Sequence, residues 1–224
     1  MIISTEGPMT EARPKNGEFP LGVRIAAKLI SYVFHPLFIP LFVAFFFIFE
    51  ARLFPDRTEW QKKLIFIQFV IYYTFLPLVA ILLAKGVGFI SSIQLPTRKD
   101  RIIPFVICEI FYFWGWYVFR NLPYFPDEVE MFGLAIFVSC SLGLIFNAYM
   151  KISMHAIALG VMLGLFGLMA LRLDLFFGPY LSLALLVAGL TCTARLIDSD
   201  HTPKEIYAGL AVGLVSQIAA SYFV

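Results

Sequence analysis

The chain has 224 residues, of which 60% are hydrophobic, 17% aromatic and only 14% charged, and its mean hydropathy is +0.85. Soluble domains carry about 45–50% apolar and about 25% charged residues, so this composition excludes a soluble enzyme and a disordered chain. The formal net charge of +2 is too small to indicate a nucleic-acid partner. The composition is that of a polytopic membrane protein.

The first 24 residues contain three glutamates, three prolines and no apolar run. This composition predicts a polar N-terminal tail over residues 1–24. The tail lacks the basic start and the apolar core of about 7–15 residues that define a secretory signal peptide. Residues 25–224 are expected to form a single transmembrane helical domain.

Seven later stretches are apolar over about the 20 residues that a helix needs to cross roughly 30 Å of hydrocarbon. Backbone groups in lipid must be hydrogen-bonded within the protein, so we expect an all-α membrane helix bundle of about seven spans. The expected spans are Leu29–Phe49, Lys63–Ala84, Ile102–Phe119, Met131–Tyr149, His155–Leu173, Gly178–Ala194 and Ile206–Phe223. The first contains Pro36 and Pro40, which each remove a backbone donor, so a kink is expected there. A six-span bundle with this stretch re-entrant is the alternative.

The number of crossings between three charged loops determines that they lie at the same face of the membrane. They are Pro96–Pro104, Lys151–His155 and Ala194–Glu205, and two expected crossings separate each loop from the next. All three must therefore lie at the same membrane face, whichever way the protein is inserted. Ionisable groups are costly beside lipid, so their grouping at one face indicates a functional site.

The residue types in these loops point to phosphate chemistry. The cations are Arg98, Lys99, Arg101, Lys151 and Arg195. Cations grouped in this way suit an oxyanion, because a guanidinium can donate two parallel hydrogen bonds to a phosphate. Two histidines, His155 and His201, can divide phosphoryl transfer between a nucleophile and a proton donor. His201 and Glu205 share one helix face, so the carboxylate can orient the ring. Ser153 opens a span, where free backbone N–H groups favour a bound phosphate.

These residues resemble the motifs of the type 2 phosphatidic acid phosphatase superfamily, which also includes the vanadium haloperoxidases. The family carries three motifs, K-x6-R-P, P-S-G-H and S-R-x5-H-x3-D. The segment ARLIDSDHTPKE matches the third motif at Arg195 and His201, with Ala194 in place of Ser and Glu205 in place of Asp. The resemblance runs from about Pro96 to the C-terminus, with the motifs in the family order.

The other two motifs match in part. The segment ISMH, residues 152–155, keeps the Ser and the His but has Ile and Met in place of Pro and Gly. The segment RKDRIIP, residues 98–104, keeps the cations and a proline, but Arg101 and Pro104 are not adjacent and no Lys lies seven residues before Arg101. Met154, where the family has Gly, is expected to crowd the approach of phosphate to the backbone.

The resemblance implies hydrolysis of a lipid phosphate or diphosphate without a metal or another cofactor. It implies that His201 attacks phosphorus, that Glu205 orients its ring, and that His155 protonates the leaving alcohol. The phosphate-binding residues implied in this way are Arg195, Arg101, Lys99, Ser153, Lys151 and Arg98.

The expected partner is a membrane lipid substrate, because little of the chain lies outside the membrane. Undecaprenyl diphosphate, phosphatidic acid, phosphatidylglycerol phosphate and the lipid A phosphates are the candidates, in the inner membrane of a bacterium. The alternatives are an inactive family member that acts as a binding protein and a transporter of anionic lipids. Transporters often carry paired broken helices, whereas here only the first span is broken, which counts against transport.

Lysine and arginine counts leave the orientation of the site open. The face of the three loops carries 11 of these residues against 6 on the other face, which favours the cytoplasm. Without the six that lie in the loops themselves, the counts are 5 and 6. The family resemblance favours the outer face instead.

Several of these residues also have structural interpretations. Arg98 and Lys151 fit anchors at the membrane surface as well as phosphate ligands. His35 is expected to pack beside Pro36 or to line a pocket, and Asp200 or Thr202 is expected to cap the last span. Three cysteines, Cys108, Cys140 and Cys192, lie inside apolar runs with no spacing that suits a metal.

Overall fold

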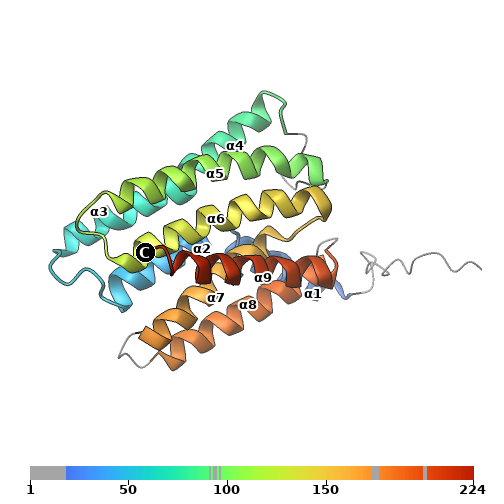
Figure 1. Ribbon diagram of the computed structural model, residues 1–224. Coiled ribbons are helices and arrows are strands. Elements are labelled where there is room, and N and C mark those ends of the chain that lie inside the picture. The colour runs from blue at the N-terminus through green and yellow to red at the C-terminus, as the bar shows by residue number, and fades with distance from the viewer. Residues whose placement is uncertain (1–18, 91, 93–94, 96, 173–176, 199–200) are drawn as a thin grey trace, which may run out of the picture.

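The computed structural model describes residues 19–90, 92, 95, 97–172, 177–198 and 201–224, and these residues form an all-helical bundle without a strand (Figure 1). The predicted fold class is therefore confirmed. The helices are α1 (Leu21–Val33), α2 (Ile39–Phe45), α3 (Glu59–Val70), α4 (Leu76–Gly86), α5 (Arg98–Arg120), α6 (Asp127–Tyr149), α7 (Met154–Arg172), α8 (Gly178–Asp198) and α9 (Pro203–Ala220). Two π-helical turns, η1 (Phe46–Glu50) and η2 (Ile71–Phe75), continue α2 and join α3 to α4. Most of the expected polar tail, residues 1–18, lies outside the described residues, and α1 begins inside the rest of it at Leu21.

Five of the seven expected spans are helices long and apolar enough to cross a membrane. They are the continuous Glu59–Gly86 element and the helices α5, α6, α7 and α8. The seventh expected span is α9, whose 18 residues extend about 27 Å, slightly less than the hydrocarbon thickness. The protein is thus an integral membrane protein, and its last helix is short.

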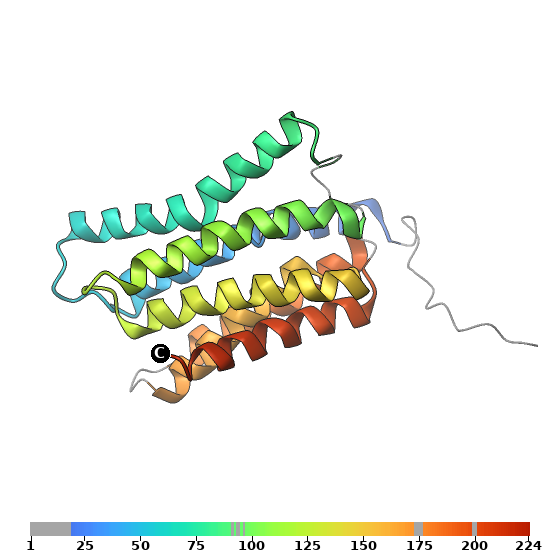
Figure 2. The ribbon, with the colours of Figure 1, turned by 45° about the horizontal axis from the view of Figure 1, so that its top comes forward.

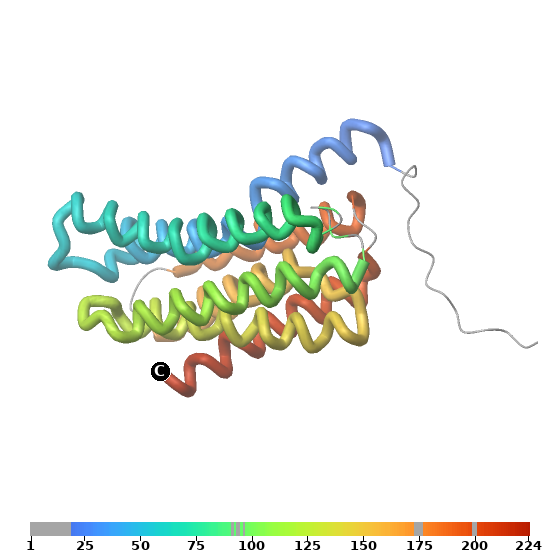
Figure 3. Tube along the Cα trace, turned by 90° about the horizontal axis from the view of Figure 1, so that it is seen from above, coloured from blue at the N-terminus to red at the C-terminus, as the bar shows by residue number. Residues whose placement is uncertain are grey.

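The first expected span, Leu29–Phe49, is not one helix. Helix α1 ends at Val33, residues 34–38 form turns, and α2 begins at Ile39. Pro40 stands in the first turn of α2, where its missing N–H has no partner to lose. The 12 residues of α2 and η1 extend only about 18 Å, too short to cross the membrane alone. Figure 3 shows α1 leaving the bundle at an angle, so the span is broken where a kink was expected.

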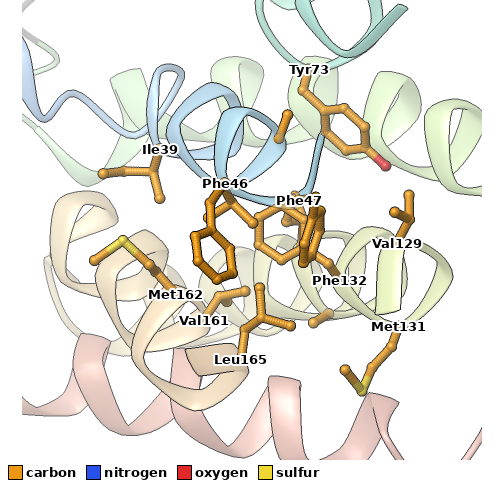
Figure 4. Packing of buried hydrophobic residues seen from close by; sticks show 14 of the residues in the cluster. Ile39, Phe46, Phe47, Tyr73, Val129, Met131, Phe132, Val161, Met162 and Leu165 are labelled. Atoms are coloured by element: carbon orange, nitrogen blue, oxygen red, sulfur yellow. The ribbon is translucent and has the colours of Figure 1, made fainter. Parts of the chain in front are cut away.

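The short α2–η1 segment is held by aromatic packing in the middle of the bundle (Figure 4). The ring of Phe46 lies 4.7 Å from that of Phe166 on α7, and the ring of Phe47 lies 5.8 Å from that of Phe132 on α6. In a membrane, van der Waals packing of this kind replaces the hydrophobic effect as the force between helices. Both phenylalanines are buried, and they fix the segment although it does not span.

Helices α7 and α9 are in backbone contact through glycines. Gly160 and Gly164 on α7 and Gly209 and Gly213 on α9 form two small-xxx-small pairs. A Cβ atom on Gly209 would lie 2.8 Å from the carbonyl oxygen of Ser153, and one on Gly213 would clash with the carbonyl oxygen of Ile157. Later residues of α9 meet later residues of α7, so the two helices are parallel and their N-termini lie at the same end of the bundle.

Candidate functional site

The loop before α9 holds His201 in a fixed orientation. Its Nδ1 lies 3.1 Å from Oε2 of Glu205, and the same oxygen accepts a hydrogen bond of 3.0 Å from the backbone nitrogen of Thr202. The hydroxyl of Thr202 in turn accepts from the backbone nitrogen of Glu205 at 3.4 Å, which completes a capping box at the start of α9. The expected Thr202 cap is present. Because an ionised carboxylate only accepts, Nδ1 of His201 carries the proton and Nε2 keeps its lone pair.

Arg101 faces the other nitrogen of this histidine. Its Nη2 lies 3.4 Å from Nε2 of His201, and the arginine side chain is only 4% exposed. Its Nε donates to the carbonyl oxygen of Leu95 at 3.2 Å and its Nη1 to that of Ile152 at 2.7 Å. These two carbonyls come from the segments before α5 and before α7. One guanidinium therefore joins the first two charged loops and points at the third.

The three charged loops meet at one end of the bundle, as the number of crossings predicts (Figure 2). The N-termini of α5, α7 and α9 and the C-terminal turn of α8 come together there. On α8, the half-buried guanidinium of Arg195 interacts electrostatically with all three histidines of the chain. Cations beside the N-termini of two parallel helices give this end a positive potential that suits an anion.

The surroundings of His201 keep its ring neutral. Burial is the largest cause, and the charges of Arg101, Arg195 and Lys151 act in the same direction, so that the pKa of His201 falls to about 3. A neutral ring at pH 7 presents the unprotonated Nε2 that a nucleophile needs. The contact with Glu205 is accordingly a hydrogen bond to a carboxylate in this state.

His155 stands in the first turn of α7, beside the break in the first expected span. Its Nε2 lies 3.2 Å from the carbonyl oxygen of Ser31, in the last turn of α1. Its ring meets that of His35 edge-on, with the ring centroids 5.3 Å apart. The break in the chain thus brings a third histidine to the site, from a part of the sequence that the three motifs do not cover.

One of the sequence-predicted phosphate ligands, Arg98, has structural partners. Nη1 of Arg98 donates to the carbonyl oxygens of Ala148 and Tyr149 at 2.9 and 3.0 Å, and so caps the C-terminus of α6. The side chain of Asn147 donates to the backbone of Arg98 at 2.8 Å and fixes the same junction. For Arg98, the structure supports the interpretation as a structural residue.

Ser153 is fully buried beneath the site. Its hydroxyl accepts from the backbone nitrogen of Ala156 at 3.4 Å, and its own backbone nitrogen donates to the carbonyl oxygen of Glu205 at 3.3 Å. Ser153 therefore links the first turn of α7 to that of α9. Lys99 is exposed on the first turn of α5. Lys151 is half-buried, and its positive charge contributes to the lowered pKa of His201.

The Met154 side chain forms part of an apolar cavity wall beside the site. It packs against the small cluster that contains Ile90 and Leu95. Asp200, the other expected cap of the last span, lies outside the described residues. Asp198, in the last turn of α8, interacts with Arg195.

No family model, no curated protein and no solved structure matches this chain. The relation to the type 2 phosphatidic acid phosphatase superfamily stays a prediction that rests on the three motifs.

Proposed function

We propose that the protein is an integral membrane phosphatase that hydrolyses a lipid phosphate or diphosphate through a phosphohistidine at His201. The observation that carries this proposal is the pair of contacts on one buried imidazole. Glu205 accepts from Nδ1, while Nε2 faces Arg101 at 3.4 Å among the other cations. In this arrangement the lone pair of a neutral histidine faces the guanidinium of Arg101, and an anion that takes over that donor would place its phosphorus next to Nε2.

In the first step, Nε2 of His201 attacks phosphorus and the bond between phosphorus and the leaving oxygen breaks. The leaving oxygen takes a proton from the imidazolium form of His155, which becomes neutral, so a monoester releases an alcohol and a diphosphate releases a lipid monophosphate. The ring of His201 becomes positive as the N–P bond forms, and the carboxylate of Glu205 balances that charge. Arg101 and Arg195 stabilise the negative charge on the phosphate oxygens in the transition state.

In the second step, water gives a proton to His155 and attacks the phosphorus. The N–P bond breaks, inorganic phosphate leaves, and His201 returns to its neutral form. The lipid chains stay in the bilayer, since the site lies at the ends of membrane helices. These features support a lipid substrate over a soluble phosphate ester.

The test is phosphate release by the detergent-purified protein from a panel of lipid phosphates and diphosphates, in the presence of EDTA. We expect release by the wild type, no release by His201→Ala, and normal release by Lys63→Ala, an exposed residue at the start of α3. Acid quench with labelled substrate should trap the phosphohistidine. Release lost in EDTA, or unchanged in His201→Ala, would contradict the mechanism. Binding of the lipids without release would favour the binding or transport roles.

A further inference from the structure

An apolar cavity of about 340 Å³ adjoins the candidate site. Three residues of its wall also belong to the surroundings of the site. The carbonyl of Leu95 binds Arg101, the ring of His35 packs on His155, and Met154 directly precedes His155. A ligand that fills the cavity therefore ends next to the cations.

The cavity extends from the site into the membrane interior. On α5 its wall includes Pro104, Cys108 and Tyr112, which stand four residues apart on one face of the helix. Because α5 starts at the site, this stripe runs about 12 Å deeper into the bundle. On α7, which also starts at the site, the wall reaches Val161.

Helix α6 and two irregular segments form the remaining sides of the cavity. One is the break between α1 and α2, which contributes the consecutive residues His35 to Pro40. The other is α4, which leaves the direction of α3 after the π-helical turn η2 and Pro77 (Figure 2). The residues that break the first span thus also build the wall of the cavity.

The chemistry of the wall identifies the kind of ligand. None of the wall residues that the structure describes is an aspartate, glutamate, lysine or arginine. The hydroxyl of Ser139 donates to its own helix at the carbonyl of Ile136, 2.9 Å away. Of the described wall residues near the cations, Pro36, Leu95 and Met154 offer no side-chain donor, whereas Tyr32 and His35 offer one each. A hydrocarbon chain suits a wall that is otherwise apolar, because the chain carries no group that needs a hydrogen bond.

The volume agrees with a single chain. A cavity of about 340 Å³ lies at the low end of the ~300–1,000 Å³ typical of small-molecule sites. It is roughly twice the ~150 Å³ cavity that takes one benzene ring.

We infer that this cavity binds the phosphate-proximal part of one hydrocarbon chain of the substrate, and that its depth sets the preference for chain length. The inference rests on the proposed function, because it takes the headgroup of the same ligand to lie among the cations at Arg101 and Arg195. The inference goes beyond that function by naming two residues that should determine the preferred chain length. Ala158 lies in the wall on α7, and Tyr112 lies at the deep end of the stripe on α5.

The experiment compares phosphate release from n-alkyl phosphates, from butyl to hexadecyl, below their micelle concentrations. We expect kcat/KM to rise by up to about fourfold per methylene until the cavity is full, and then to level. Ala158→Phe, which fills the cavity, should move the plateau to shorter chains. Tyr112→Ala, which opens it, should move the plateau to longer chains. Gly167→Phe on the same helix is the matched control, because a Cβ there meets no atom within 4 Å.

A second measurement needs no catalysis. Non-hydrolysable n-alkyl phosphonates should raise the Tm of the protein in detergent with the same dependence on chain length, and n-alkanols of equal length should raise it much less. Equal effects of the alkanols would assign the cavity to any membrane-lipid chain and overturn the inference. A plateau at the same chain length in Ala158→Phe, Tyr112→Ala and the wild type, either in phosphate release or in the rise of Tm, would also overturn the inference. No release from any ester, with phosphonate shifts that follow the variants, would overturn the phosphatase proposal and keep the cavity assignment.

Discussion

One oxygen of Glu205, Oε2, lies 3.1 Å from Nδ1 of His201 and so combines two tasks, because it also closes the capping box at the start of α9. The histidine precedes the cap residue Thr202 by one position. The capping box that starts α9 therefore also fixes the orientation of the imidazole ring. Capping and charge balance are nevertheless separable, since only the second needs a negative charge.

Glu205→Gln should lower kcat by about 10²-fold or more while changing Tm little. Glutamine can still accept from the backbone nitrogen of Thr202, but it cannot balance the positive charge that develops on His201 during attack. Thr202→Ala should do the reverse and cost about 1 kcal/mol of stability with little loss of kcat. Phosphate release and thermal unfolding of both variants in one detergent check the pair. Equal losses of kcat in the two variants would show that Glu205 acts only as a cap.

The stability of the protein should fall as the pH is lowered from about 6.5 toward 3. The folded protein holds the pKa of His201 near 3, whereas the ordinary value is 6.5. Between these values the unfolded chain binds a proton that the folded chain does not, so acidification favours unfolding. The groups that face the ring are Arg101, Arg195, Lys151 and Glu205. His201→Gln should flatten this part of the profile of Tm against pH, and an unchanged slope in the variant would contradict the assignment.

The sequence was sufficient to predict the class of fold and the meeting of the three loops. Long apolar stretches allow few structures other than helices in lipid, and counting their crossings places loops on faces without any knowledge of packing. Six of the seven expected spans have both ends within four residues of the observed helix bounds. The first span was the exception, because Pro36 and Pro40 could either kink the helix or divide it, and tertiary packing decides between the two.

The side-chain roles depended on contacts that spacing does not report. Nothing in the motif shows that Arg98 caps α6 through Ala148 and Tyr149, since those residues lie about fifty positions away. The approach of His35 to His155 likewise depends on the break in the first span. The paired glycines of α7 and α9, in contrast, were visible in the sequence as two small-xxx-small patterns, although the partner of each pattern was not.

Arg101→Lys should impair both stability and activity. The two carbonyls of Leu95 and Ile152 accept from different nitrogens of one planar guanidinium, a geometry that an ammonium group cannot reproduce. Leaving a buried carbonyl unsatisfied costs about 1–3 kcal/mol, so a clear fall in Tm is expected together with a loss of kcat/KM. Arg98→Lys is the matched control, since Arg98 is exposed. Loss of its cap on α6 is expected to cost less than about 1 kcal/mol of stability and to leave kcat/KM unchanged. Similar losses of activity in both variants would instead place Arg98 among the phosphate ligands.

Gly213→Ala should separate α7 from α9 and reduce activity at a distance from the site. A methyl group there would clash with the backbone of Ile157 and Val161, which cannot rotate away as a side chain could. Overpacking of this kind costs about 1–3 kcal/mol or more. Any shift between the helices also moves the first turn of α7, with His155, relative to His201. Gly189→Ala on α8 is the control, because a Cβ at that position meets no atom within 4 Å and alanine favours a helix over glycine. We expect both Tm and kcat to fall in Gly213→Ala and both to stay at the wild-type values in Gly189→Ala. A Gly213→Ala protein with wild-type Tm would show that the two helices are free to move apart.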